Sequence, residues 1–251
     1  MNLYTIWCIF WFTIVFLFLY PSLWLSTQRK EWHYWNGFLY RIWAKVLYFG
    51  MGIKVETEWE FQPNPKQNYI YVSNHTSYMD IAAMVMTVPR FSVFMGKASL
   101  SKVPLFGYLF KKIHIPVSRG QGSSRIEAFE KVKEALAEGK NVLIYPEGGI
   151  IGTNQPELNP FKEGAFRAAI QTNIPLVTVT ILYNWIIFPD KQPFKFTRHK
   201  CKMIYHSPIE TTNLSENDIE DLKNRTFQLI DSTIKENIKE ELKIKNYELR
   251  M

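Results

Sequence analysis

From residue 53 onward, short apolar runs alternate with amphipathic segments, and turn residues separate them. Runs rich in β-branched and aromatic side chains predict strands at 53–61, 69–74, 91–96, 113–118, 141–146, 174–184 and 201–210. Apolar positions at helical spacing predict helices at 79–88, 123–140, 161–173 and 215–246, and helical pieces on either side of Pro104 at 100–112. Strands separated by helices indicate one α/β domain whose mixed, largely parallel sheet is flanked by helices.

Two of the predicted helices have clear boundary signals. The helix at 123–140 ends at Gly139, and its apolar stripe consists of Ile126, Phe129, Val132 and Leu136. The helix at 215–246 is long, charged and amphipathic, and Ser215 with Asp218 is typical of a capping box. We therefore expect the α/β domain, residues 53–251, to close with an amphipathic C-terminal helix.

The first 28 residues have a different pattern. Residues 6–25 carry no charge, and twenty helical residues span about 30 Å, the hydrocarbon thickness of a bilayer. A cleaved signal peptide would place positive charge before the run and small residues after it, and this sequence has neither. We expect residues 1–28 to form a transmembrane or membrane-inserted helix. Arg29 and Lys30 follow it, which predicts that the rest lies on the cytoplasmic side of the inner (plasma) membrane.

Residues 29–52 combine apolar, aromatic and basic side chains. Arg41 and Lys45 lie one helical turn apart, and Trp35 and Trp43 belong to the residue types that favour the headgroup zone of a bilayer. The pattern predicts an interfacial amphipathic helix whose basic side chains extend toward the headgroups. The alternative is a core helix of the domain that carries two surface cations.

Charge narrows the classes of partner. The 251 residues include 30 Lys and Arg against 23 Asp and Glu, a formal net charge of +7, which suits anionic partners. No basic cluster with stacking aromatics lies apart from the membrane segments, so we expect no nucleic acid. The five histidines show no HExxH or similar spacing, and Cys8 and Cys201 form no metal motif, so we also expect no metal.

The candidate chemistry lies in YVSNHTSYMDIAAM, residues 71–84. Residues five apart on one helix sit about 140° apart, so His75 and Asp80 meet only if His75 precedes the helix and Asp80 lies in its first turn. Asp80 would then hold one ring nitrogen, and the other nitrogen could accept a proton. The structural alternative is a capping pair of Ser77 and Asp80 with an inert loop histidine at position 75.

Four segments in order carry a resemblance to a known family. They are NHTSYMD, an N-H-x4-D motif; KASLSKVPLFGYLFKKIHIPVSR, with Lys97, Leu100, Pro104, Gly107 and Arg119; YPEGG; and NIPLVTVTI. Together they resemble the glycerolipid acyltransferases typified by PlsC-like 1-acylglycerol-3-phosphate acyltransferases. The resemblance covers roughly residues 50–210.

The resemblance implies an enzyme that transfers a fatty acyl group from acyl-CoA or acyl-carrier protein to the free hydroxyl of lysophosphatidic acid. His75 would deprotonate that hydroxyl and Asp80 would orient His75. The acceptor oxygen would attack the thioester directly, which agrees with the absence of a G-x-S-x-G elbow. The implied partners are the lipid bilayer, a lysophospholipid and the acyl donor, with no further cofactor.

The same resemblance implies a set of substrate-binding residues: Asn74, Lys97, Arg119, Glu147, Gly148 and Gly149. Three of them have a structural alternative, since Lys97 also fits a surface lysine, Arg119 a solvated loop arginine and Glu147 a turn glutamate.

One motif departs from the family pattern. Many members continue Glu-Gly-Thr-Arg, and their arginine is associated with the acceptor's phosphate, whereas this chain has Gly149 and Ile150. Lys162 is a candidate for the compensating charge. The departure leaves open another acceptor, such as lyso-ornithine lipid, or a catalytically inactive membrane protein that only binds lipid.

Overall fold

The computed structural model describes residues 2–118, 122–150, 155–191 and 193–248, with side chains described through residue 242. Its sheet has seven strands in the order β1-β7-β6-β2-β5-β3-β4. The strands are β1 (Val55–Trp59), β2 (Ile70–Ser73), β3 (Ser92–Lys97), β4 (Ile115–Val117), β5 (Asn141–Ile144), β6 (Leu176–Leu182) and β7 (Cys201–Tyr205). All neighbouring strands pair in parallel except β6 and β7. The predicted mixed, largely parallel sheet is confirmed.

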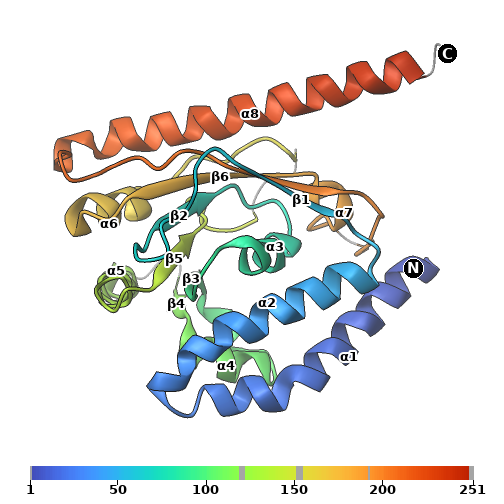
Figure 1. Cartoon of the computed structure of the whole chain (residues 1–251), viewed down its shortest axis with the longest axis horizontal. Helices are drawn as coiled ribbons and strands as arrows, with labels where there is room; N and C mark the ends of the chain where they lie inside the picture. Colours follow the sequence, from blue (N-terminus) through green and yellow to red (C-terminus); the bar gives the residue numbers. More distant parts are fainter. Residues whose placement is uncertain (1, 119–121, 151–154, 192, 249–251) are drawn as a thin grey trace.

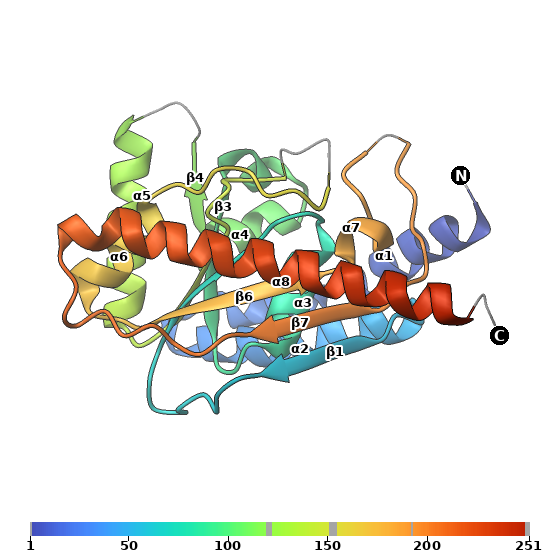
Figure 2. The same ribbon diagram turned by 90° about the horizontal axis from the view of Figure 1, so that it is seen from above.

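Helices cover both faces of the sheet (Figure 1). The α-helices are α1 (Leu3–Ser26), α2 (His33–Gly50), α3 (Met79–Thr87), α4 (Phe106–Ile113), α5 (Gly122–Ala137), α6 (Gly164–Thr172), α7 (Asn184–Ile187) and α8 (Ile219–Glu248). Three 3-10 turns join them: η1 (Lys30–Trp32), η2 (Ala98–Lys102) and η3 (Glu216–Asp218). One face packs against α5, α6 and α8, and the other against α1, α2 and α3. Figure 2 shows α8 lying along the sheet.

The central strands are buried on both faces, as parallel strands between two helical layers must be. Every residue of β2, β5 and β6 is buried. In β2 the side chains alternate, since Ile70 and Val72 face the α5, α6 and α8 layer while Tyr71 faces the α2 and α3 layer. Each central strand therefore contributes to two cores.

Most predicted elements occur close to their expected positions. The region 100–112 is broken near Pro104 into η2 and α4, as its sequence predicts. The Ser215–Asp218 capping box is present and precedes α8. The strand predicted at 174–184 is shorter, because Tyr183 takes a left-handed conformation (φ +72°) and the chain turns into the four-residue helix α7. That turn was not predicted, and it positions a residue of the candidate site.

Helices α1 and α2 form an antiparallel pair under the sheet (Figure 1). The indole N–H groups of Trp7 and Trp11 donate to the carbonyls of Gly50 (2.8 Å) and Val46 (3.0 Å). Within the described residues, α1 is the one helix long and apolar enough to cross a membrane. Its most apolar stretch has a mean hydropathy of 2.1, and 17% of that stretch is buried. The predicted division at residues 28 and 52 falls close to the ends of α1 and α2.

Candidate active site

The candidate site lies where three parallel strands end. The loop after β2 carries His75, the loop after β5 carries Glu147, and the turn after β6 carries Asn184. Because β2, β5 and β6 are parallel, their carboxyl ends share one edge of the sheet. In open α/β sheets this edge is the usual place for ligand binding.

His75 and Asp80 meet as predicted. His75 Nδ1 lies 3.0 Å from Asp80 Oδ2, with His75 ahead of α3 and Asp80 in its first turn. The same oxygen accepts the backbone N–H groups of Thr76 (2.7 Å) and Ser77 (2.9 Å), so Asp80 also satisfies donors before the helix. The expected geometry is confirmed, and the capping role coexists with it. The catalytic role remains a prediction.

The outer nitrogen of His75 is free to act on a ligand. Its Nε2 has no hydrogen-bond partner in the part of the chain that the structure describes, while Asp80 accepts the Nδ1 proton. The ring stacks on Tyr145 with centroids 4.0 Å apart, and 11% of the side chain is exposed. An imidazole held by a carboxylate at one nitrogen and open at the other has the arrangement of a general base.

Asn184 completes the environment of Asp80, and the sequence reasoning missed it. Its Nδ2 donates to Asp80 Oδ1 over 2.8 Å, and both residues are fully buried. Asp80 thus receives two backbone donors, one amide and the imidazole. The sequence signal was an asparagine directly after a run of apolar strand residues, which does not by itself identify a partner 104 positions away.

Glu147 fixes the backbone of the histidine loop. Its Oε1 accepts the His75 N–H (2.8 Å), and its Oε2 accepts the backbone and side-chain N–H groups of Asn159 (2.9 Å each). Burial raises the pKa of the Glu147 carboxyl above its ordinary value, while the donors of Asn159 and His75 oppose that shift. Glu147 therefore holds two loops together, and Asn159 is a second residue that the sequence reasoning missed.

The two glycines after Glu147 have a backbone that other residues rarely adopt. Gly148 has φ +78° and Gly149 has φ +147°. A Cβ on Gly148 would lie 2.5 Å from Lys162 Nζ, so the ammonium of Lys162 lies directly against this turn. The structure therefore brings Lys162 next to the motif that lacks the family's arginine.

The remaining predicted site residues differ in how they are placed. The Asn74 side chain donates to and accepts from the backbone of Ile181 (2.8 Å each), so it joins the β2 loop to β6. Lys97 ends β3 and is exposed, and no described residue forms an ion pair with it. Arg119 lies outside the described residues.

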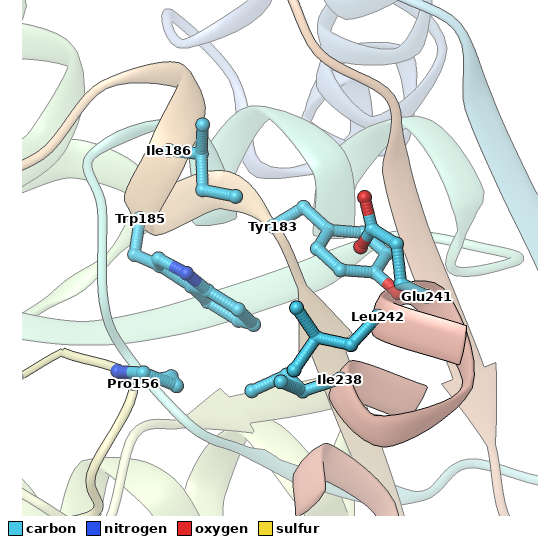
Figure 3. Close-up of a pocket in the computed structure, with 7 residues that line it drawn as sticks. All are labelled: Pro156, Tyr183, Trp185, Ile186, Ile238, Glu241 and Leu242. Atoms are coloured by element: carbon cyan, nitrogen blue, oxygen red, sulfur yellow. The ribbon is translucent and has the colours of Figure 1, made fainter. Parts of the chain in front are cut away.

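An apolar hollow of about 260 Å³ lies between residues of α7 and residues of α8 (Figure 3). Its lining residues are Pro156, Tyr183, Trp185, Ile186, Ile238, Glu241 and Leu242. Neither His75 nor Asp80 lines it. The chemistry of the candidate site therefore resides at the strand ends and not in this hollow.

The sequence matches a family model and several named proteins. The Acyltransferase family model matches residues 52–182. A chloroplastic 1-acyl-sn-glycerol-3-phosphate acyltransferase from Brassica napus is 25% identical over 182 residues, which is 72% of this chain and 51% of that protein. The 1-acyl-sn-glycerol-3-phosphate acyltransferase alpha from Ovis aries is 29% identical over 184 residues, 72% of this chain and 62% of that protein. The chain thus spans between half and two thirds of these relatives.

A solved structure shares the fold. The 1-acyl-sn-glycerophosphate (LPA) acyltransferase PlsC from Thermotoga maritima matches with a TM-score of 0.76 over 93% of this chain and 95% of that chain. The sequence identity is 21%, so the likeness concerns the arrangement of helices and strands.

Proposed function

The chain belongs to the acyltransferase family, and on that premise we propose that it transfers a fatty acyl group to the free hydroxyl of lysophosphatidic acid, giving phosphatidic acid. The observation that carries the proposal is the His75–Asp80 pair, with its outer nitrogen open at the carboxyl edge of the sheet. The names of the relatives from Brassica napus and Ovis aries support the choice of acceptor.

The proposed reaction needs no enzyme nucleophile. His75 Nε2 takes the proton of the acceptor hydroxyl as its oxygen attacks the thioester carbonyl of acyl-CoA or acyl-carrier protein. The carbon–sulfur bond then breaks, an ester forms, and the leaving thiolate recovers the proton from the imidazolium. General-base assistance of this kind contributes about 10²–10⁴-fold to the rate. Asp80 stabilises the imidazolium that forms between the two proton transfers.

The acceptor's phosphate requires cations near this edge. Lys162 lies against Gly148, and Gly148 follows the residue that binds the His75 backbone. Lys97 is exposed at the end of β3, and Arg119 belongs to the same role by resemblance. We assign the phosphate to these three cations, with Lys162 supplying the charge that Gly149 and Ile150 lack.

The acceptor and the donor both indicate the cellular location of the enzyme. A lysolipid partitions into a bilayer, and the apolar helix α1 fits a chain that works at a membrane. We propose that the site faces the cytoplasm at the inner membrane, where acyl-CoA and acyl-carrier protein are available, and that no cofactor beyond the acyl donor takes part.

An acceptor panel tests the proposal. Purified wild type and His75→Ala would be given labelled acyl-CoA or acyl-carrier protein with lysophosphatidic acid, a lysophospholipid without a terminal phosphate, and lyso-ornithine lipid. We expect phosphatidic acid from wild type only. Preference for lyso-ornithine lipid would replace the assigned acceptor, in agreement with the altered Glu-Gly-Gly-Ile motif. Lipid binding without any product would overturn the enzymatic proposal.

A further inference from the structure

The loop between η2 and α4 exposes apolar side chains at its tip. Val103 and Leu105 are each 44% exposed, and Pro104 between them is also exposed. The buried face of α4 is made by other residues, among them Leu109 and Phe110. The apolar tip is therefore not part of the core on which α4 packs.

The backbone holds this tip in a strained conformation. Leu105 has φ +61° and ψ −58°, and the Phe106 N–H donates to the carbonyl of Pro104 over 2.6 Å, which forms a γ-turn of the rare, positive-φ kind. The Gly107 N–H donates to the carbonyl of Val103 over 2.7 Å and closes the loop. A glycine at position 105 would remove the strain, yet the chain has a leucine there and exposes it.

Three exposed lysines flank the tip along the chain. Lys102 precedes it, and Lys111 and Lys112 lie in the last turn of α4; all three are exposed. Among the described residues none of the three forms an ion pair, although four of the five lysines described on α5 and α8 do, such as Lys131 with Glu127. Exposed apolar side chains between lysines that form no ion pair complement a surface that is apolar inside and anionic at its rim.

The loop continues the apolar surface of α1. The hydroxyl of Tyr20 donates to the carbonyl of Leu105 (3.5 Å), and Gln28 Nε2 donates to the hydroxyl of Tyr108 (3.2 Å). These bonds place α4 beside the C-terminal half of α1 (Figure 1). In that half Leu17, Phe18 and Leu25 are exposed, Phe18 by 81%. Val103 and Leu105 thus extend an exposed apolar face that is already large.

We propose that residues 102–105, together with Lys111 and Lys112, form a second membrane-docking element that inserts Val103 and Leu105 into an anionic bilayer beside α1. The lysines bind anionic headgroups while the two apolar side chains enter the region below them. Because η2 follows directly on Lys97 at the end of β3, this contact holds the carboxyl edge of the sheet near the bilayer surface.

Depth measurements on the full chain test the proposal. Leu105→Cys would be labelled with an environment-sensitive fluorophore and reconstituted into anionic vesicles that contain spin-labelled lipid. The matched control is Ile126→Cys on α5, where the native side chain is 68% exposed. Cys8 and Cys201 are buried, so labelling of wild type gives the background. We expect the probe at position 105 to be quenched by at least about twofold and the probe at position 126 to be unaffected.

A charge variant separates insertion from simple proximity. Lys111→Glu with Lys112→Glu should reduce the quenching at position 105 in anionic vesicles and have little effect in neutral ones. A probe at position 105 that stays in water, on protein that floats with the vesicles, would overturn the proposal and leave the tip as a surface for another protein. Flotation and quenching require no acyl transfer, so this result is independent of the enzymatic proposal.

Discussion

At the scale of single residues, His75 is held from three sides. Asp80 binds its Nδ1, Glu147 binds its backbone N–H and Tyr145 stacks on its ring. Asn184 in turn binds Asp80. Asn184 orients the Asp80 carboxylate, so it affects the reaction through the His75 imidazole that this carboxylate binds.

Asn184→Ala tests this chain of contacts. Loss of the amide leaves Asp80 Oδ1 without its donor, so we expect kcat to fall about 10–100-fold while KM for the acceptor stays within about twofold. Ile186→Ala, which alters α7 on the side that faces the hollow of Figure 3, is the control for damage to the helix. In an Asp80→Ala background the Asn184 substitution should cost nothing further. Independent, additive losses would show that Asn184 only stabilises the fold.

His114 makes the stability of the fold depend on pH. Its ring packs against Tyr40, Phe94 and Phe110, and its Nδ1 accepts the Phe94 N–H over 3.2 Å. Burial lowers the pKa of His114 to about 3 from an ordinary value of 6.5. The unfolded chain therefore binds this proton first as the pH falls, and the free energy of unfolding decreases from pH 6.5 toward pH 3.

His114→Asn should weaken that dependence, because an asparagine keeps an acceptor for Phe94 and cannot be protonated. Between about pH 7.5 and pH 4.5 we expect wild type to lose about 1–3 kcal/mol more unfolding free energy than the variant. The lower part of that range allows for screening by solvent, because His114 is half-buried. Urea unfolding at both pH values measures the difference. Equal losses in the two proteins would exclude His114 as the cause.

At the scale of elements, one carboxylate, that of Glu147, connects the chain after β5 to the His75 backbone. Glu147 uses both oxygens as acceptors, one for His75 and one for Asn159. A glutamine at this position must point its NH₂ at one of these donors, so one contact is lost. The loop and the histidine are then no longer held together.

Glu147→Gln should therefore lower kcat about 10–100-fold and leave the secondary structure intact. Circular dichroism and acyl-transfer kinetics on the same preparation check the two parts of this prediction. Gln171→Glu, an amide–carboxyl exchange on the surface of α6, is the matched control. Near-normal kcat in Glu147→Gln would mean that the carboxylate is not needed to position His75.

The sequence predicted the parts of this site that depend on local pattern. The meeting of His75 and Asp80 follows from one strand, one turn and one helix, all of which have clear periodicity. Asn184 and Asn159 could not be predicted, because their partners lie far away in sequence and the pairing depends on which strands are neighbours. Gly148 illustrates the intermediate case, since the sequence suggested Lys162 as the compensating charge for this motif but not its direct approach to Gly148.

At the scale of the whole molecule, α1 touches the domain at both ends. Thr5 accepts the Phe196 N–H near the start of α1, and Gln28, just after its end, donates to Tyr108 of α4. Trp7 and Trp11 bind α2 between these points. A helix that follows the domain along its length does not extend away from it across a bilayer. Of the two predicted arrangements, this favours insertion over spanning.

Cysteine accessibility distinguishes the two arrangements. Leu3→Cys and Gln28→Cys place thiols at opposite ends of α1, where both native side chains are exposed. In sealed vesicles we expect a membrane-impermeant maleimide to label both thiols from the same side. Labelling from opposite sides would establish a spanning helix and would require the contacts of Thr5 or Gln28 to break.

The central claim is that one imidazole, aligned by one carboxylate, deprotonates a lipid hydroxyl. The most direct test is kcat/KM for acyl transfer to lysophosphatidic acid in wild type, His75→Ala, Asp80→Ala and the double variant. We predict a loss of about 10²–10⁴-fold for His75→Ala and no substantial further loss in the double variant, because the two residues act as a unit. A folded His75→Ala protein that retains more than about a tenth of wild-type kcat/KM would contradict the account.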